Sequence, residues 1–339
     1  MSILEYVSLQ PYNTFGLDAT AHYFCRVQSK SDIQYLIEDE WQYYRQHLII
    51  GGGSNLLFCS NVDGLAIINE IVGIEIIKED DDYVWIQCLS GTTWHDVVLY
   101  CVDRDWYGIE NLSLIPGTIG AAPMQNIGAY GAELKDVFEE LEAIDLRTAK
   151  SKIFSNAACE FGYRESIFKK AEKGNYFIYS VTLKLHKKQK INTAYGDIQK
   201  VLSEKNILHP TAKDISDAVI SIRESKLPNP KVLGNAGSFF KNPEVEKTLA
   251  LQIQHSHPNL PMYELENGKV KIPAAWLIEQ CGWKGKKIGN TGNHAKQALV
   301  IVNYGNASGT EIWQHAQQVQ LSVNETFGIH LEPEVNVWL

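Results

Sequence analysis

The segment Ile49-Ile-Gly-Gly-Gly-Ser-Asn-Leu56 places three consecutive glycines and two small polar residues directly after an apolar run that is typical of a strand. Glycine has no Cβ, so the backbone N–H groups of such a loop can approach a phosphate group closely. The loop is not a dinucleotide-binding fingerprint, because Gly51-x-Gly53 lacks the third glycine at the required spacing, and no Gly-Lys-Ser/Thr follows to make a P-loop. Taken alone, the segment fits a phosphate loop and a plain tight turn equally well.

A second segment of small residues changes that balance. It runs from Pro116-Gly-Thr-Ile-Gly-Ala-Ala-Pro123 through Met124-Gln-Asn-Ile-Gly-Ala-Tyr-Gly-Ala132, and ten of its seventeen residues are Gly, Ala or Pro while none is charged. Many backbone donors can therefore lie near the surface with little side-chain bulk around them. The two segments together predict a diphosphate cofactor held by neutral N–H groups rather than by Lys or Arg. The alternative is a buried glycine-rich crossover packed against a helix.

Short apolar runs bounded by turn residues predict strands over residues 47–50, 65–68 and 83–86. The clearest alternation comes later, where one face of a strand is expected to carry Phe177, Tyr179, Val181, Leu183 and Leu185. The prolines of Lys226-Leu-Pro-Asn-Pro-Lys231 forbid regular helix, and we place a module boundary there. Strands and helices do not alternate regularly, so we expect an α+β protein with separate modules.

The last third of the chain holds two well-marked helices. One begins at Pro273 and is stopped by Gly282, and the other runs from about Ser308 to Phe327. The second has a capping box formed by Ser308 and Glu311, followed by an apolar stripe at helical spacing.

The composition is that of an ordinary globular protein: 339 residues, 45% of them apolar and 21% charged. With 31 basic and 40 acidic residues, the net charge of −9 gives no basic field to attract nucleic acid or anionic lipid, so we expect neither partner. No window reaches about 18 unbroken apolar residues, and the first residues lack the pattern of a signal peptide, so we expect no membrane insertion. Six dispersed cysteines without a C-x-x-C pair favour a reducing cytoplasm, where we expect the protein to act.

Two segments carry side chains suited to catalysis. In Phe161-Gly-Tyr-Arg-Glu-Ser166, Arg164 can grip a carboxylate with two hydrogen bonds, although a surface ion pair with Glu160 or Glu165 explains it equally well. Gly234-Asn-Ala-Gly-Ser-Phe-Phe-Lys-Asn-Pro243 presents Ser238 between a glycine and two aromatic residues. Because the nucleophile elbow G-x-S-x-G is absent, proton donation outranks acyl-enzyme chemistry for this serine.

A third segment, Leu331-Glu-Pro-Glu-Val335, supplies two carboxylates next to a proline that restrains the backbone. Only one of them need point into a site. A solvated strand entry near the C-terminus is an equal alternative.

Taken together, these segments closely resemble the family of UDP-N-acetylenolpyruvoylglucosamine reductases (MurB), flavoenzymes of peptidoglycan precursor synthesis. The resemblance covers nearly the whole chain in order, and so many segments would not agree by chance. The matching segments are Asn13–Gly16, Gly51–Leu57, Leu114–Glu133, Phe161–Phe168, Tyr195–Asp197, Lys226–Pro243, Pro273–Gly282 and Leu331–Val335.

The resemblance implies a three-part α+β flavoprotein. Residues 1–70 and 71–215 would bind FAD in the manner of the vanillyl-alcohol oxidase (PCMH) type, with the C-terminal strand 328–339 returning to the second part. Residues 216–327 would form an α+β substrate-binding domain. The family reaction uses NADPH to reduce FAD, and the reduced FAD passes hydride to the UDP-linked enolpyruvyl amino sugar, which gives UDP-N-acetylmuramate. This chemistry needs no metal, and we expect a monomer.

The functional residues of the family match positions of this sequence. Ser238 resembles the general acid that protonates the substrate carbon, and Arg164 with Glu334 resembles the pair that binds and polarises the enolpyruvyl carboxylate. Glu334 would then carry or share a proton, so we expect its pKa to be raised. Tyr195 resembles the mobile tyrosine that closes on the substrate diphosphate in one of two subtypes of the family. The other implied contacts are Tyr163, Lys226, Asn242 and Gln297 for the substrate, and Gly51, Gly53, Ser54, Asn55, Gly117, Gly120, Asn126, Gly128 and Ala129 for FAD.

Two other functions stay open at this point. A flavin oxidase of the same superfamily would use oxygen, but it would leave Arg164, Ser238 and Glu334 without a purpose. A nucleotide-binding regulatory module is the non-enzymatic alternative, and an intact proton donor and carboxylate pair argue against it. The chain ends five residues after Glu334, where some relatives continue with additional strand, and this end leaves Glu334 intact.

Overall fold

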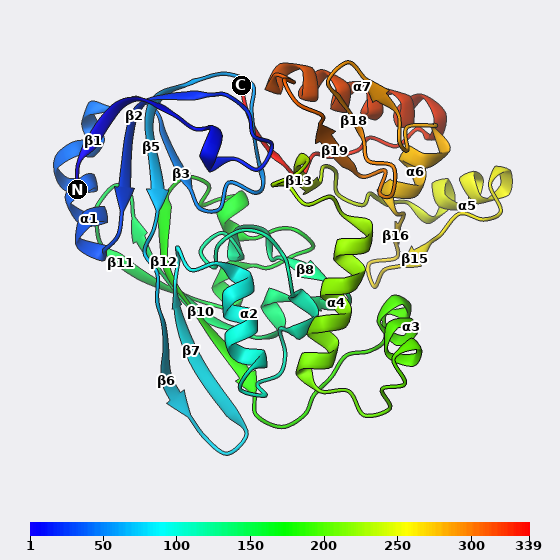
Figure 1. Cartoon of the computed structure of the whole chain (residues 1–339), viewed down its shortest axis with the longest axis horizontal. Coiled ribbons are helices and arrows are strands. Elements are labelled where there is room, and N and C mark those ends of the chain that lie inside the picture. The colour runs from blue at the N-terminus through cyan, green and yellow to red at the C-terminus, as the bar shows by residue number, and fades with distance from the viewer. The chain divides into compact units, whose positions relative to one another are not determined.

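The computed structural model describes all 339 residues and divides into two compact units. The first unit contains Met1–Val7, Ala21–Gly52 and Val62–Ser225, and the second contains Ser8–Thr20, Gly53–Asn61 and Lys226–Leu339. Each unit combines sheets with helices, which confirms the α+β class (Figure 1). The finer division into three modules stays a prediction.

The first sheet of the first unit has the strand order β1-β2-β5-β3, and β5 runs parallel to both β2 and β3. Its strands are β1 (Ile3–Ser8), β2 (Thr20–Val27), β3 (His47–Ile50) and β5 (Val62–Asn69). Strand β5 suits a central position because nearly all of its side chains are apolar and buried. Helix α1 (Lys30–Tyr35) begins at a capping box formed by Ser29 and Asp32, and Ile33 packs into the core beside this sheet.

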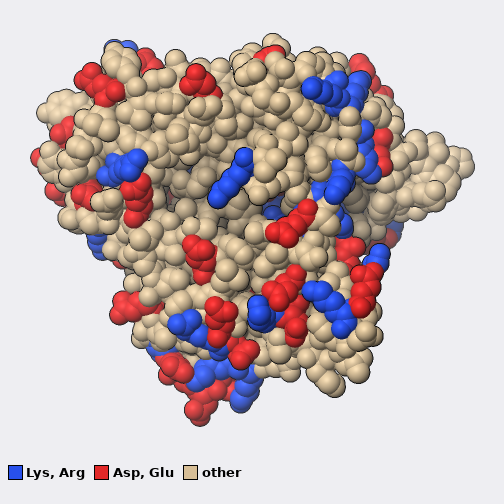
Figure 2. Space-filling model, viewed as in Figure 1, with Lys and Arg blue, Asp and Glu red and all other residues tan.

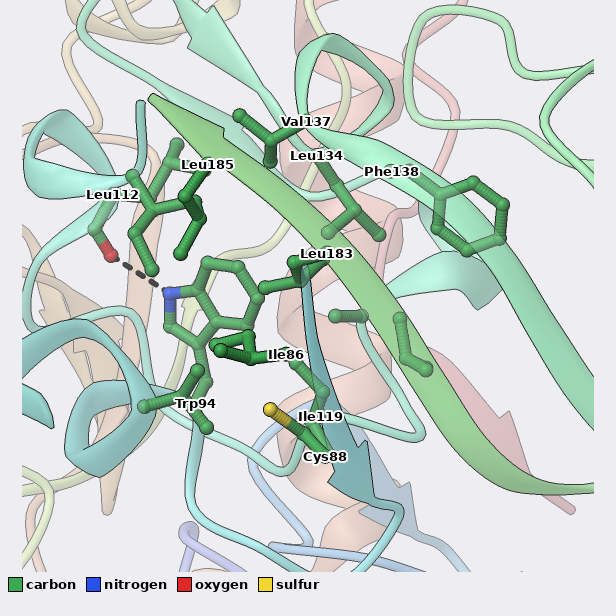
Figure 3. Packing of buried hydrophobic residues seen from close by; sticks show 14 of the residues in the cluster. Ile86, Cys88, Trp94, Leu112, Ile119, Leu134, Val137, Phe138, Leu183 and Leu185 are labelled. Atoms are coloured by element: carbon green, nitrogen blue, oxygen red, sulfur yellow. Dashed lines mark hydrogen bonds between the residues drawn. The ribbon is translucent and has the colours of Figure 1, made fainter. Parts of the chain in front are cut away.

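The second sheet of the first unit is antiparallel, with the order β11-β10-β12-β7-β6. Its strands are β6 (Ile74–Glu79), β7 (Tyr83–Leu89), β10 (Phe138–Asp145), β11 (Ser151–Ser155) and β12 (Tyr176–His186). Helix α2 (Trp94–Val102) packs its apolar side chains against it. At the centre, the buried Trp94 ring lies among residues of β7 and β12, and its Nε1 donates a hydrogen bond to the carbonyl oxygen of Leu112 at 2.9 Å (Figure 3). This bond satisfies the one polar group of a large buried side chain.

The expected alternation along β12 is interrupted. Phe177 and Tyr179 contact the core cluster that includes the first sheet, whereas Val181 and the apolar residues after it face the cluster around Trp94. The register with β10 shifts at this point and leaves Tyr179 as an extra residue, so a β-bulge reverses the period-two pattern. The strand itself is confirmed, but the expectation of one shared face was wrong for its first residues.

Two more helices of the first unit, α3 (Gly196–Glu204) and α4 (Ala212–Lys226), pack together through a small apolar cluster. Ser216 on α4 exchanges a 2.8 Å hydrogen bond with Ser113, which follows the 3-10 turn Glu110–Leu112. This buried contact fixes α4 to the segment that precedes the second glycine-rich loop.

The main sheet of the second unit is antiparallel, with the order β13-β19-β18-β17. Its strands are β13 (Gly234–Ser238), β17 (Lys287–Ile288), β18 (Thr291–Asn293) and β19 (Val300–Asn303). Helix α7 (Gly309–Phe327) contacts this sheet through its buried stripe, starts at the Ser308–Glu311 capping box and ends at Gly328 with φ +66°. Helix α6 (Ala274–Gln280) contacts α7, so both predicted helices are confirmed. The smaller elements are β14 (Glu244–Val245), α5 (Lys247–Ser256), β15 (Tyr263–Glu264) and β16 (Val270–Lys271).

The C-terminal strand β20 (Asn336–Trp338) pairs in parallel with β4 (Leu56–Phe58) inside the second unit. We expected this segment to return to residues 71–215, and that position was wrong. The buried strand β4 needs a hydrogen-bonding partner, and β20 provides it. Gly309 helps to fix the arrangement, because a Cβ there would lie 1.6 Å from the carbonyl oxygen of Phe58.

Acidic and basic side chains are interspersed on the face drawn in Figure 2. At the tip of the β6–β7 hairpin, Lys187 lies 2.6 Å from Glu79, and Lys188 pairs with Asp82. None of the helices is both long and apolar enough to span a bilayer.

Candidate active site

Two loops that the sequence predicts to hold a cofactor lie against each other in the first unit. After β3 the chain passes so close to the second loop that a Cβ on Gly51 would lie 2.4 Å from Oγ1 of Thr118. A Cβ on Gly52 would lie 2.9 Å from the Cα atom of Gly117. The N–H of Gly120 donates a 2.9 Å hydrogen bond to the carbonyl oxygen of Ser90, between β7 and α2, and this bond holds the second loop in place. The two glycine segments therefore meet, and neither has room for larger side chains at the contact.

The hydroxyl of Thr118 at this contact is buried and has no hydrogen-bond partner within the protein. An unsatisfied buried hydroxyl costs about 1–3 kcal/mol, so the position suits a group that the chain itself does not supply. Backbone donors and a neutral hydroxyl fit the diphosphate of FAD. The sequence reasoning did not single out Thr118, although it stands inside the Pro116–Pro123 segment.

The remaining cofactor candidates of the first glycine loop belong to the second unit. Gly53 has φ +60°, and a Cβ there would lie 1.9 Å from the carbonyl oxygen of Tyr12. Ser54 and Asn55 form the turn that leads into β4. The side-chain amide of Asn55 donates to the backbone carbonyl of Glu334 at 3.2 Å, which joins this loop to the C-terminal segment.

Asn126, in the second glycine-rich segment, is completely buried. Its Nδ2 donates to the Glu133 carboxylate and to the carbonyl of Gly162, both at 3.0 Å, and its Oδ1 accepts the N–H of Lys135 at 3.1 Å. The side chain therefore holds the loop in shape, and a contact between Asn126 and FAD stays a prediction. The next candidates, Gly128–Ala129, form the short strand β8, which pairs with β9 (Ala132–Glu133).

Tyr163 and Arg164 form a two-residue turn in the first unit. Gly162 and Glu165 close the turn with a pair of backbone hydrogen bonds of 3.0 and 3.3 Å. Arg164 has φ +55°, a left-handed conformation that costs a residue with a Cβ about 1–2 kcal/mol. Its Nη2 donates to the carbonyl oxygen of Gly128, and its guanidinium lies 5.3 Å from the centroid of the Tyr163 ring. A strained and anchored arginine of this kind is typical of a functional position.

Ser238 and Glu334 lie on neighbouring extended segments of the second unit. Ser238 is the last residue of β13, pairs with Val300 and is exposed. The carbonyl oxygen of the next residue, Phe239, accepts the N–H of Glu334 at 2.8 Å. The structure therefore places the backbones of Ser238 and Glu334 on adjacent segments of the chain.

The other substrate candidates of the second unit have local hydrogen bonds or defined positions of their own. Asn242 Oδ1 accepts the N–H of Ala274, the first residue of α6, at 2.9 Å. Gln297 stands in the turn before β19, where its Oε1 accepts the N–H of Leu299 at 3.4 Å. Lys226 is half-buried at the C-terminal end of α4.

Tyr195 belongs to the first unit and precedes α3 as its N-cap residue. Its ring packs edge-on against Tyr130, with the ring centroids 5.1 Å apart and the planes at 83°. About half of the Tyr195 side chain stays exposed. The tyrosine therefore lies at the surface, on a ring contact that a ligand could replace.

Two family profiles match this chain. Residues 229–338 match the C-terminal domain of UDP-N-acetylenolpyruvoylglucosamine reductase, and residues 21–153 match an FAD binding domain. The second match confirms the prediction of FAD for the first half of the chain.

Curated relatives match along nearly the whole length. The UDP-N-acetylenolpyruvoylglucosamine reductase of Flavobacterium johnsoniae is 51% identical over 99% of this chain and 100% of its own. The enzyme of the same name from Amoebophilus asiaticus is 50% identical over 99% of both chains, and that from Pseudomonas aeruginosa is 43% identical over 100% of this chain and 99% of its own.

The crystal structure of UDP-N-acetylenolpyruvylglucosamine reductase from Thermus caldophilus has a similar fold. It aligns over 100% of both chains with a TM-score of 0.67 at 23% sequence identity.

Proposed function

Because this chain belongs to the family of UDP-N-acetylenolpyruvoylglucosamine reductases, we propose that it reduces the enolpyruvyl ether of UDP-N-acetylglucosamine to UDP-N-acetylmuramate with NADPH. It is an FAD-dependent oxidoreductase. The observation that carries the proposal is the 51% identity to a curated reductase over 99% of the chain. We expect the enzyme to act as a monomer in the cytoplasm, in peptidoglycan precursor synthesis.

The chemistry that bound FAD supplies is hydride transfer from NADPH to the enolpyruvyl double bond. The residues that would hold its diphosphate are Gly51, Gly52, Gly117 and Thr118, where backbone donors and an unpaired hydroxyl meet. None of these four residues is charged. They are therefore suited to hold the cofactor while the charged substrates bind and leave.

Arg164 has the role of binding the enolpyruvyl carboxylate. Negative charge moves toward this carboxylate when hydride adds to the methylene carbon, and a fixed guanidinium stabilises it. The bond from Arg164 to Gly128 supports this role because it orients the side chain before the substrate arrives.

Ser238 and Glu334 have complementary roles in the steps that follow hydride transfer, protonation of the substrate and stabilisation of the enolate. The Ser238 hydroxyl gives its proton to the carbon next to the carboxylate, and Glu334 in its protonated form donates a hydrogen bond to the developing enolate. Their neighbouring backbone segments and the exposure of Ser238 support this assignment.

The remaining candidates bind the nucleotide part of the substrate. Lys226 contributes positive charge for the diphosphate, Asn242 and Gln297 contribute amide groups, and Tyr163 contacts the substrate and NADPH in turn. Tyr195 closes over the diphosphate, as in the subtype with the mobile tyrosine.

The test is an anaerobic experiment with the FAD-loaded protein. The flavin is first reduced with NADPH, and the UDP-linked enolpyruvyl sugar is then added while flavin absorbance is followed. Rapid reoxidation with formation of UDP-N-acetylmuramate is the expected result. A flavin that stays reduced until oxygen enters would instead establish the oxidase, and the proposal would be wrong.

A further inference from the structure

One of the two carboxylates in the segment Leu331–Val335 is bound by a lysine of the neighbouring segment. Nζ of Lys241 donates a 2.7 Å hydrogen bond to Oε1 of Glu332, which makes the contact an ion pair. The Lys241 side chain is 10% exposed, whereas the Glu332 side chain is 66% exposed. A largely buried ammonium group needs a counter-charge, and Glu332 supplies one. The two glutamates of the segment therefore have different surroundings.

This ion pair lies at one end of a short antiparallel pairing between two backbone segments of the second unit. At this end, the N–H of Lys241 donates to the carbonyl oxygen of Glu332 at 2.9 Å. At the other end, the N–H of Glu334 donates to the carbonyl oxygen of Phe239 at 2.8 Å. Pro333 lies in the middle of the pairing and has no N–H to donate. Few backbone hydrogen bonds join the segments, so the side-chain contact is a substantial addition.

The spacing of the two glutamates makes the alignment of this pairing important. Residues two positions apart in an extended segment lie on the same face, so Glu332 and Glu334 share a face. A shift by two residues would bring Glu332 opposite Phe239, where Glu334 now stands, and would bring His330 opposite Lys241. Opposite charges directly across a strand pair are favourable. The pairing of Lys241 with Glu332 therefore favours the observed alignment over the shifted one.

We propose that Lys241 is a positioning residue for the reduction, because its ion pair with Glu332 holds the segment in the alignment that presents Glu334 beside the Ser238 strand. The inference rests on the proposed function, which gives Ser238 and Glu334 their roles. Leu331 is completely buried and anchors the same segment in the core. The ion pair adds alignment on the face that carries the carboxylates, where a small displacement is costly for the reaction.

Replacing Lys241 by methionine removes the ammonium group and keeps most of the apolar stem. Flavin reoxidation by the enolpyruvyl substrate should slow about 10- to 100-fold, because the reacting groups lose their alignment. Flavin reduction by NADPH should stay near the wild-type rate, since Ser238 and Glu334 act only in the second half-reaction. The dissociation constant of the UDP-linked sugar should also stay near wild type, whereas a lysine that contacts the substrate directly would change it. K241R keeps the charge and should retain most of the reoxidation rate.

A double-mutant cycle on the FAD-loaded protein tests whether Lys241 acts through Glu332. The variants are K241M, E332Q and the double variant, and stopped-flow absorbance gives the rate of each half-reaction. E332Q should slow reoxidation, and the double variant should be no slower than K241M, because both changes break the same contact. Losses that multiply in the double variant would show that Lys241 acts independently of Glu332 and would overturn the proposal.

The matched control is another lysine–glutamate pair of the same unit. Nζ of Lys247 lies 2.6 Å from Oε1 of Glu264, and both side chains are exposed. K247M and E264Q change the net charge in the same way as K241M and E332Q. Both control variants should keep wild-type rates in both half-reactions.

Melting temperatures of all variants distinguish positioning from a contribution to stability alone. E332Q alters an exposed side chain and should melt like the wild type, so it tests the proposal even if K241M does not fold. A wild-type reoxidation rate in E332Q would overturn the positioning role, and so would a lowered melting temperature of K241M with unchanged rates. If the flavin of the wild-type protein is not reoxidised by the enolpyruvyl sugar, the proposed function is wrong instead.

Discussion

The guanidinium of Arg164 donates a hydrogen bond to the backbone carbonyl oxygen of Gly128, and this bond fastens the Tyr163–Arg164 turn to the second glycine-rich segment. The turn holds Arg164 at φ +55°, so its position depends on the anchor as well as on local backbone preference. Arg164, the candidate residue for binding the substrate carboxylate, is therefore joined structurally to the segment that is predicted to bind the flavin.

We expect Arg164→Lys to slow the oxidative half-reaction by about 10²–10³-fold. Lysine keeps the charge, but it lacks the planar fork that can bond Gly128 and a carboxylate together. Stopped-flow measurement of flavin reoxidation by the enolpyruvyl substrate checks this, with flavin reduction by NADPH as the internal control. Equal rates for wild type and variant would mean that the side chain has only a structural role.

Ser238→Ala should lower the rate of flavin reoxidation by about 10²–10⁴-fold, the usual contribution of a general acid. Flavin reduction by NADPH should stay near normal, because that step needs no proton on the sugar carbon. Ser238 is exposed at the end of β13, so its removal should not alter the melting temperature. If both half-reactions slowed by the same factor, proton donation could not be its role.

Thr118→Ala should weaken FAD binding about tenfold while leaving the apoprotein as stable as the wild type. The hydroxyl has no hydrogen-bond partner in the protein, so removing it should not lower the free energy of unfolding of the apoprotein. Its loss should be felt only when the ligand is bound. Thr118→Ser keeps the hydroxyl and should retain the flavin. Fluorescence titration of the apoproteins with FAD, together with thermal melting, separates the two variants. Destabilised Thr118→Ala apoprotein with unchanged FAD affinity would contradict this assignment.

The elements that local chemistry specifies could be predicted from the sequence. Helix α7 is an example, because its capping box, apolar stripe and terminal glycine all lie within one continuous segment. The same holds for β3, whose apolar run ends directly at a glycine loop. The two glycine loops could be predicted as ligand segments, but their contact through Gly51 and Thr118 depends on the fold.

Other features depend on partners far away in the chain. The bulge at Tyr179 arises from register with β10, and the pairing of β20 with β4 joins residues that are far apart in sequence. Asn126 is a further example, because its side chain makes three hydrogen bonds to residues that the sequence does not mark as its partners. The Nε atom of Arg223 on α4 shows the reverse case, because its lack of a hydrogen-bond partner can be recognised only when all its neighbours are known.

A buried histidine of the second unit gives the stability of the protein a defined pH dependence. Nε2 of His315 on α7 lies 2.7 Å from Oδ1 of Asn293, and its Nδ1 is buried without a partner. Burial, with the nearby charge of Lys286, lowers the pKa of His315 from its usual value to about 4. A second proton on this ring would find no acceptor, so folding favours the neutral form.

The sign of the effect follows from linkage. Between about pH 4 and about pH 6.5 the unfolded chain binds a proton at this histidine while the folded chain does not, so stability rises with pH by up to about 1.4 kcal/mol per pH unit. The contribution is complete above the unfolded pKa and is lost as the pH falls toward 4. His315→Gln keeps a donor for Asn293 but cannot titrate, so its stability should change less steeply over this range. Urea unfolding of both proteins from pH 4.5 to 7.5 isolates the difference, because all other groups titrate in both. Parallel stability curves would mean that His315 has the same pKa in the folded protein as in the unfolded chain, against the burial that the structure gives it.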